Sequence, residues 1–374
     1  KKNRRMPDRC VLLACGGTGG HIFPAFSVAE EFKKKYPALR LVYVCGNKDI
    51  ENAIFRMISG EKVIPVESAP FRGGYSLFSP AFLLKLLQGF RQSYKILRTE
   101  RPAVVVGFGG HFSFPVILAA RCLGIRTVIH EQNVMPGFAN KVLMRFADAV
   151  ALSFEETRAY LASHRLMKRT GNPIRASIEK DCREEALKFF GFSPEKATVL
   201  VLGGSQGSES INTVFLECLA KLPIELRSSF QAVHLTGKMS TALAEEACAK
   251  EGVFSRAFSF FERMDLVYGA ADFALGRAGA TFLAEAKAKQ IPAILVPYPF
   301  AGGHQLLNAR AFLEGGNSWV IEQKDLSAET LAPVLKKFTE TALREIKMKK
   351  PPVPASENSR TQLMNFIEEC AGWV

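Results

Sequence analysis

The sequence lacks any uninterrupted apolar run long enough to cross a membrane. Its longest apolar region, Ala103 to Ala120, is broken by three glycines and a proline, whereas a spanning helix needs about 20 consecutive apolar residues. The run Cys10 to Cys15 is shorter and ends at glycines, so it is too short for the core of a signal peptide. We therefore expect any membrane contact to be peripheral.

Closely spaced cysteines are absent as well. The eight cysteines include no C-x-x-C pair, and several fall within apolar segments typical of strands. We interpret them as reduced, buried thiols of a cytoplasmic protein.

The composition is that of a folded protein rather than a disordered one, with 48% apolar and 23% charged residues. A length of 374 residues exceeds what one hydrophobic core usually supports, so two domains are expected. The formal charge of +13 favours an anionic partner such as a nucleic acid, a phosphorylated ligand or an acidic lipid surface. No RRM, KH or zinc-finger pattern is present and the cations are spread along the chain, which argues against nucleic acid.

Short strand-like runs alternate with longer helical stretches, a pattern typical of α/β proteins with doubly wound parallel sheets. The pattern restarts after the turn-rich residues 170–175, where we place the domain boundary. The predicted domains are 1–174 plus 355–374, and 175–354. The second portion of the first domain is a final helix, Asn358 to Cys370, with Ser356 as a candidate cap. The expected strands are 11–14, 41–44, 63–66, 104–107, 127–130, 149–153, 198–202, 232–235, 257–260, 273–275, 293–296 and 319–321.

Three glycine-rich loops follow predicted strands: Gly16 to Gly20, Gly107 to His111 and Gly203 to Ser208. The first precedes a helix that we expect to begin near His21 to Pro24, and helix N-termini and loop amides bind anions. One such loop could equally be a tight turn without a ligand. Three of them, at the carboxyl ends of strands in two domains, predict ligand binding in an interdomain cleft. The dinucleotide motif G-x-G-x-x-G and the Walker A motif both fail in spacing.

The motifs together identify a resemblance. They are 16-GGTGGH-21, 107-GFGGH-111, 130-HEQN-133, 171-GNPIR-175, 203-GGSQG-207 and the segment from Arg277 to Gln305. In order and spacing they resemble the MurG family of N-acetylglucosaminyltransferases along nearly the whole chain. The resemblance implies a GT-B fold of two Rossmann-like domains and a hexosyltransferase activity. The implied reaction is inverting transfer of GlcNAc from UDP-GlcNAc to the 4-hydroxyl of MurNAc in lipid I, which yields lipid II and UDP.

The resemblance also implies roles for individual residues. UDP-GlcNAc would be bound by Thr18, Gly19, Gly20, Asn133, Arg175, Ser205, Phe261, Ala280, Thr281, Phe282, Leu283, Ala284, Glu285 and Gln305. Glu285 would accept hydrogen bonds from both ribose hydroxyls. The acceptor pyrophosphate would lie at Gly16, Gly17, Gly109, Gly110 and His111. Because the chain has no Asp-x-Asp pair and helix amides can stabilise the departing diphosphate, we predict no obligatory metal or other cofactor.

An inverting transfer requires a base for the acceptor hydroxyl. His21 is the first candidate, since a helix N-terminus favours its neutral form; it could instead pack the loop or contact the sugar. Glu131 is the second candidate, and it could instead position the acceptor. His111 stands where the family often has tyrosine, and an aspartate common shortly before Gln305 is missing. The family's acceptor contact through tyrosine and its sugar contact near Gln305 therefore do not carry over directly to this chain.

The expected partners are lipid I, the anionic surface of the bacterial inner membrane on its cytoplasmic face, and other cell-wall enzymes, with no nucleic acid. Tyr75 to Phe90 is strongly apolar and is accompanied by Lys85, Arg91, Lys95, Arg98 and Arg101, as in an interfacial helix. A buried helix with a cationic flank would look the same. Two further functions remain open at this stage: a UDP-GlcNAc 2-epimerase, and a nonenzymatic nucleotide-sugar sensor.

Overall fold

The structure, a computed structural model, describes residues 9–46, 60–69, 79–161, 166–204, 207–300, 303–313, 318–348 and 358–373. The chain divides into two compact units. Unit 1 comprises Lys1–Arg175 and Asn358–Val374, and unit 2 comprises Ala176–Glu357. The boundaries that we placed after residues 174 and 354 therefore fall one residue and three residues later.

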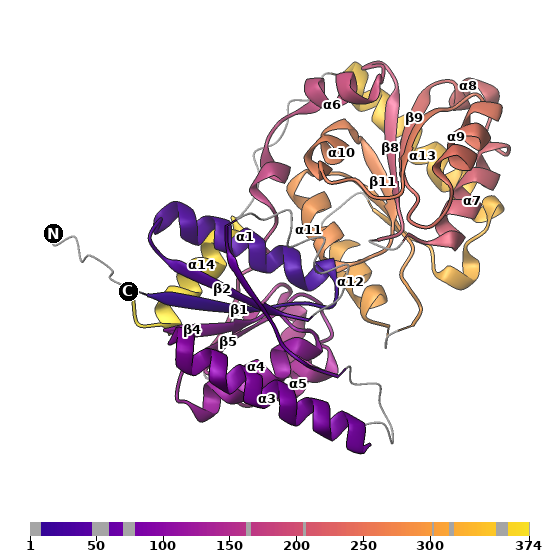
Figure 1. Ribbon diagram of the computed structural model, residues 1–374. Coiled ribbons are helices and arrows are strands. Elements are labelled where there is room, and N and C mark those ends of the chain that lie inside the picture. Colours follow the sequence, from indigo (N-terminus) through magenta and orange to yellow (C-terminus); the bar gives the residue numbers. More distant parts are fainter. Residues whose placement is uncertain are drawn as a thin grey trace. The chain divides into compact units, whose positions relative to one another are not determined.

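The described part of unit 1 forms a parallel sheet of seven strands in the order β3-β2-β1-β4-β5-β6-β7 (Figure 1). The three-residue edge strand β7 was not predicted, because Met-Lys-Arg carries no apolar run. The strands are β1 (Cys10–Ala14), β2 (Arg40–Cys45), β3 (Lys62–Pro65), β4 (Val104–Gly107), β5 (Arg126–Glu131), β6 (Ala149–Leu152) and β7 (Met167–Arg169).

Helices cover both faces of this sheet. The unit contains α1 (Gly19–Lys35), α3 (Pro80–Glu100), α4 (Gly110–Cys122), α5 (Phe138–Leu143), the 3₁₀ helix η2 (Glu155–Tyr160) and α14 (Ser359–Cys370). Alternate β1 residues enter different cores: Val11 and Leu13 pack with residues of α1 and α14, and Leu12 with residues of α3 and α4. A parallel strand buried on both faces is apolar throughout, which explains why β1 reads as one continuous apolar run.

Local signals set where these helices begin. α1 begins at Gly19, slightly earlier than expected. α3 has Pro80 in its first turn, and the Ser79 hydroxyl accepts a hydrogen bond from the Phe82 N–H. The cap of α14 is Asn358, whose side chain accepts from the Thr361 N–H; Ser356, our candidate, lies outside the described residues.

The C-terminal helix α14 belongs to unit 1, where it lies beside α1 (Figure 1). The Lys35 ammonium lies 2.7 Å from the buried Glu368 carboxylate, and Trp373 packs edge-on against Phe32. The Arg360 guanidinium donates to the main-chain oxygen of Ile174 at 3.1 Å. These contacts fasten the end of the chain to the segment that leads out of the first sheet.

The described part of unit 2 repeats the design with six parallel strands in the order β10-β9-β8-β11-β12-β13. They are β8 (Ala197–Leu202), β9 (Phe230–Leu235), β10 (Phe254–Phe258), β11 (Phe273–Gly276), β12 (Ala293–Leu295) and β13 (Trp319–Val320). β10 begins three residues before the segment that we predicted, 257–260. Its first four residues alternate between exposed and buried, as expected of an edge strand, so no continuous apolar run marked its start.

The helices of unit 2 again flank the sheet, with α7 and α13 packed into one core. They are η3 (Ala176–Glu179), α6 (Arg183–Phe190), α7 (Glu209–Leu219), α8 (Ile224–Arg227), α9 (Thr241–Lys250), α10 (Met264–Ala270), α11 (Ala280–Ala288), α12 (His304–Leu313), η5 (Gln323–Asp325) and α13 (Ala328–Lys347). Among the described residues, no helix is both long and apolar enough to cross a membrane.

All eight cysteines are free thiols, but they are not all buried. Cys122 is exposed, and Cys182 and Cys370 are partly exposed. The expectation of uniformly buried thiols was therefore wrong at these positions, which lie at or next to helix ends rather than in strands.

Candidate functional site

Each sheet reverses its strand order at one point, between β1 and β4 in unit 1 and between β8 and β11 in unit 2. Parallel α/β sheets bind ligands outside the carboxyl ends of their strands at such switch points. The three predicted glycine loops follow β1, β4 and β8. The topology therefore brings two of them to the switch point of unit 1 and the third to that of unit 2.

The two loops of unit 1 touch through glycines. Gly17, Gly109 and Gly110 have φ values of +86°, +89° and +74°, which favour glycine. A Cβ on Gly110 would lie 3.0 Å from the main-chain oxygen of Gly16, so any larger residue would push the loops apart. The first-turn N–H groups of α1 and α4 lack partners within their own helices, so both helix N-termini offer donors at this edge.

His21 lies in the first turn of α1, against the second glycine loop. Its Nδ1 is 3.2 Å from the main-chain oxygen of Gly16 and 3.3 Å from the Thr18 hydroxyl. A Cβ on Gly109 would lie 3.3 Å from His21 Nε2, so the ring lies against the backbone of the β4–α4 loop. Burial lowers the pKa of His21 below its ordinary 6.5, although the bond to Gly16 opposes this. The ring is therefore neutral at neutral pH.

Glu131, the second candidate base, is buried at the end of β5 and is 1% exposed. Oε1 accepts hydrogen bonds from the main-chain N–H and the side-chain amide of Asn133, at 2.9 and 3.2 Å. Oε2 accepts from the side-chain amide of Asn140 at 2.7 Å. A carboxylate engaged in this way orients its neighbours, so the geometry favours positioning over proton abstraction.

Asn140, on α5, was not among the predicted site residues. A Cβ on Gly109 would lie 3.3 Å from its Nδ2, the same distance as from His21 Nε2. Its Oδ1 is buried without a hydrogen-bond partner in the described structure. In the sequence, Asn140 is marked only by its position seven residues after Asn133, and this spacing does not predict that it lies beside His21.

Arg175 lies in unit 1, not in the donor domain where we had placed it. Its guanidinium stacks over the ring of Phe23 on α1, 4.4 Å from the ring centre. The preceding turn is anchored by His130, whose Nε2 donates to the Gly171 oxygen at 3.1 Å, while Gln132 lies 3.1 Å from His130 Nδ1. Arg175 is thereby held beside the first turn of α1.

His111, in the first turn of α4, is partly exposed. Its ring lies 4.0 Å from that of Phe112, and its main-chain oxygen accepts from the Ser68 hydroxyl at 2.8 Å. A Cβ on Gly17 would lie 3.9 Å from its ring. The structure thus brings His111 to the same edge as Gly16, Gly17 and His21.

In unit 2, Arg277 connects the loops at the switch point. Nη1 donates to the Val296 oxygen at 3.0 Å, after β12, and Nη2 donates to the Ser208 hydroxyl at 2.8 Å, at the N-terminus of α7. The loop after β8 is thereby tied to those after β11 and β12. Gly204 in this loop has a φ of +88° and open space where a Cβ would lie. Ser205, the predicted diphosphate contact, lies outside the described residues.

Glu285, the predicted ribose ligand, is buried on α11 with 4% of its surface exposed. Its Oε2 accepts a hydrogen bond from the Tyr268 hydroxyl at 2.8 Å. Thr281 precedes it by one helical turn, so the two share a face of α11, with Ala280, Phe282, Leu283 and Ala284 completing the predicted stretch. A solvated helix-face glutamate is excluded by this burial.

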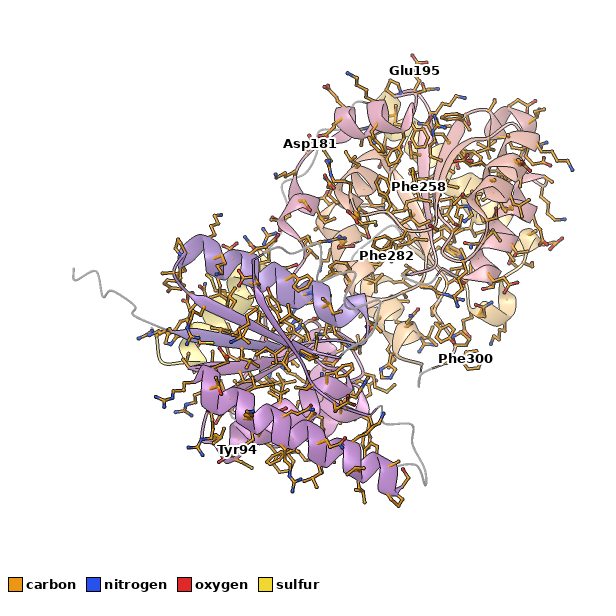
Figure 2. All side chains as sticks on the ribbon, in the orientation of Figure 1. Tyr94, Asp181, Glu195, Phe258, Phe282 and Phe300 are labelled. Atoms are coloured by element: carbon orange, nitrogen blue, oxygen red, sulfur yellow. The ribbon has the colours of Figure 1, made fainter. Side chains whose placement is uncertain are left out.

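The remaining donor candidates lie elsewhere in unit 2 and in unit 1. Phe261 follows β10, and its ring lies 4.5 Å from that of Phe258, which Figure 2 labels. Gln305, on α12, accepts from the Tyr298 N–H at 3.0 Å. Thr18, Gly19, Gly20 and Asn133 lie in unit 1. No three metal-binding side chains are grouped within the part of the chain that the structure describes.

Comparison with known proteins decides the family. Residues 11–152 match the glycosyltransferase family 28 N-terminal domain, and residues 198–365 match the glycosyltransferase family 28 C-terminal domain. A relative from Halothermothrix orenii is 37% identical over 371 residues, which cover 96% of this chain and 99% of that protein. The chain belongs to glycosyltransferase family 28.

That family 28 relative is named UDP-N-acetylglucosamine–N-acetylmuramyl-(pentapeptide) pyrophosphoryl-undecaprenol N-acetylglucosamine transferase. The crystal structure of MurG from Acinetobacter baumannii has a TM-score of 0.71 at 24% identity and covers 96% of this chain and 99% of its own. A UDP-N-acetylglucosamine 2-epimerase has a TM-score of 0.63 at 12% identity, with 98% of each chain covered. The structures show a shared fold, and the resemblance to MurG proteins that the motifs indicated is confirmed.

Proposed function

We infer that this chain transfers GlcNAc from UDP-GlcNAc to the 4-hydroxyl of MurNAc in lipid I, forming lipid II and UDP in peptidoglycan synthesis. Nearly full-length relatives named for this transfer support it. The structural observation that carries it is the pair of switch points. That of unit 1 has a neutral histidine among glycine loops, and that of unit 2 has a glycine loop held by Arg277 and a buried glutamate on the helix after β11. An epimerase function has less support, because the likeness to the 2-epimerase extends to the fold alone.

On the donor side, the loop 203–208 and the N-terminus of α7 would hold the diphosphate, and Arg277 would keep that loop in place through Ser208. Glu285 would accept hydrogen bonds from the ribose hydroxyls, Phe261 would contact uracil through its backbone, and Gln305 would contact the sugar. The bond between C1 and the diphosphate oxygen breaks as UDP leaves. Main-chain N–H groups stabilise the charge that develops on that oxygen, and we propose that no metal ion is required.

On the acceptor side, the 4-hydroxyl oxygen forms the new bond to C1 while its proton passes to His21 Nε2. The ring suits this role because its Nδ1 is engaged with Gly16 and its pKa is lowered. Glu131 would act through Asn133 and Asn140 as a positioning residue. The first turns of α1 and α4, with His111, would bind the acceptor pyrophosphate, the arrangement that helix N-termini favour.

A membrane-held acceptor requires the enzyme to reach the lipid surface, and α3 supports such a contact. Leu83, Leu84 and Leu87 are 52%, 57% and 47% exposed, and their spacing places them on one helical face. Exposed cations follow along the helix at Arg91, Lys95 and Arg98. We propose that this face, the α3 patch, docks on the anionic cytoplasmic face of the bacterial inner membrane.

The deciding experiment follows UDP release from purified protein given UDP-GlcNAc and a lipid I analogue, with and without EDTA. We expect acceptor-dependent UDP release that EDTA leaves unchanged. An absence of acceptor-dependent UDP would refute the transferase assignment, and UDP-ManNAc formed from UDP-GlcNAc alone would establish the epimerase instead. Activity lost with EDTA and restored by Mg²⁺ would refute only the metal-free proposal.

A further inference from the structure

Tyr268 and Glu285 form a buried pair in unit 2. The proposed reaction gives a role to Glu285 but none to Tyr268. The tyrosine hydroxyl donates to Glu285 Oε2 at 2.8 Å. Tyr268 is 1% exposed and Glu285 is 4% exposed. They lie on different helices, α10 and α11, which precede and follow β11. The bond therefore connects the two helices that precede and follow the switch-point strand β11 in the sequence.

The tyrosine hydroxyl is not required for filling space, because a phenylalanine ring would fill nearly the same volume. Burying a hydroxyl costs free energy unless it is hydrogen-bonded, and burying a carboxylate costs more. A hydrogen bond to an ionised acceptor is shorter and stronger than one between neutral groups. The pair thus stabilises a carboxylate that would otherwise be unfavourable at this depth.

The face of α11 that carries Glu285 has a second polar group. The Thr281 hydroxyl is buried without a hydrogen-bond partner in the described structure. It lies in the first turn of α11, one helical turn before Glu285. Buried hydroxyls are nearly always paired with protein, water or ligand, so this face is suited to a polar ligand.

We propose that Tyr268 is a positioning residue for donor recognition: its hydroxyl orients the Glu285 carboxylate so that it accepts hydrogen bonds from the ribose hydroxyls of the donor. This inference rests on the proposed function, in which Glu285 binds the ribose. Each carboxylate oxygen has more than one acceptor site, so the bond from Tyr268 is compatible with ribose binding. Without the phenol, the carboxylate loses a donor that holds its orientation, and the ribose diol loses a preformed acceptor.

The test compares Tyr268→Phe with the unaltered protein for binding of UDP and of 2′,3′-dideoxy-UDP, by calorimetry. We expect the variant to bind UDP about 10-fold more weakly, which corresponds to roughly 1.4 kcal/mol, and to bind the dideoxy compound as the unaltered protein does. In turnover, KM for UDP-GlcNAc should rise while kcat at saturating donor is retained. Tyr43→Phe, which removes another buried phenol hydroxyl from β2 of unit 1, is the matched control and should change neither affinity.

A double-mutant cycle with Glu285→Ala locates the effect. We expect Tyr268→Phe to cause no further loss of UDP affinity once Glu285 is alanine. Equal weakening of UDP and dideoxy-UDP, or a full effect in the alanine background, would show that Tyr268 only supports the fold and would overturn the inference. A variant that is merely less stable would lose both affinities alike, so the ratio remains informative.

The outcome also separates this inference from the function on which it rests. If Glu285→Ala leaves UDP affinity unchanged, the proposed ribose contact is wrong and the role of Tyr268 is refuted with it. If Glu285→Ala weakens UDP but Tyr268→Phe does not, the donor site stands and only the positioning role is refuted.

Discussion

His21 Nδ1 lies 3.2 Å from the main-chain oxygen of Gly16, five residues earlier in the loop after β1. Because a carbonyl oxygen only accepts, this bond places the proton of the neutral ring on Nδ1 and the lone pair on Nε2. Burial lowers the pKa of the ring, so the neutral form persists at neutral pH. The glycine loop thereby selects the tautomer that a general base acting through Nε2 requires.

Replacing His21 with asparagine should slow turnover without preventing donor binding. The asparagine amide retains a donor that can reach toward Gly16 but has no basic lone pair. Loss of general-base catalysis costs about 100- to 10,000-fold in kcat, whereas KM for UDP-GlcNAc should change little. Steady-state UDP release measures both, and an unchanged kcat in a folded variant would exclude His21 as the base.

The pH profile provides an independent check on His21. A base with a pKa below 6.5 stays unprotonated as the pH falls through neutrality, so kcat should remain level down to that pH. Below the pKa of the ring, kcat should fall tenfold per pH unit as the ring takes up a proton. A decline centred at 6.5 would mean that an unperturbed histidine controls the reaction, and one centred above 6.5 would mean that another group does.

Glu131→Gln should impair acceptor use while leaving the shape of the pH profile intact. The carboxylate accepts from Asn133 and Asn140 through both oxygens, and a glutamine has an NH₂ group where one acceptor was. We expect KM for the acceptor to rise and stability to fall by about 1–3 kcal/mol, the cost of a disrupted buried polar group. If Glu131 were the base, kcat would collapse and the acidic limb of the profile would disappear.

The sequence was sufficient for the architecture because parallel, doubly buried strands are continuous apolar runs. β1, β4 and β8 and the glycine loops after them follow from that pattern. β7 was not predicted, since its three residues carry no apolar run, and only the end of β10 was, since its first residues alternate between exposed and buried. The exposure of Cys122 was not predicted either, because it depends on the position of this residue at the end of α4.

The side-chain partners of the site could not be predicted, because they join elements that no local pattern relates. Tyr268 and Glu285 are 17 residues apart on separate helices, and Asn140 reaches Glu131 from α5. Likewise, motif matching placed Arg175 with the donor domain, whereas the chain keeps it in unit 1 over Phe23. Motifs identify which residues are involved, and packing determines what each one touches.

Buried His234 should make the stability of unit 2 depend on pH. Its Nε2 lies 3.0 Å from Asn212 Oδ1, and its Nδ1 is buried without a hydrogen-bond partner in the described structure. Burial lowers its pKa to about 4. An unfolded histidine titrates near 6.5, so between these values the unfolded state binds more protons and stability falls with falling pH.

Urea unfolding at a series of pH values measures this effect. Stability is fully present above pH 6.5 and should decline toward pH 4, by about 3 kcal/mol for a shift of this size. His234→Gln keeps a donor near the position of Nε2 but does not titrate, so it should flatten this part of the pH dependence. An equally steep decline in the glutamine variant would assign it to other groups, among them His130, whose pKa burial also lowers to about 4.

The α3 patch predicts a membrane-binding variant that retains chemistry. Substituting Leu83, Leu84 and Leu87 with serine removes exposed apolar surface. Because each CH₂ buried in the lipid contributes about 0.8 kcal/mol, we expect vesicle affinity to fall by at least about 10-fold. Sedimentation with phosphatidylglycerol vesicles measures it. Activity toward a water-soluble acceptor analogue should be unchanged, because no residue of the patch lies in the glycine loops.

A matched control distinguishes the patch from general surface hydrophobicity. Leu243 and Ile224 in unit 2 are 63% and 68% exposed, so their replacement by serine removes comparable surface without touching α3. We expect the control to sediment as the unaltered protein does. Raising the salt concentration should weaken vesicle binding of both the unaltered protein and the control, since Arg91, Lys95 and Arg98 would act by screened attraction to the anionic surface. Equal loss in patch and control variants, or none in either, would show that α3 is not the docking surface.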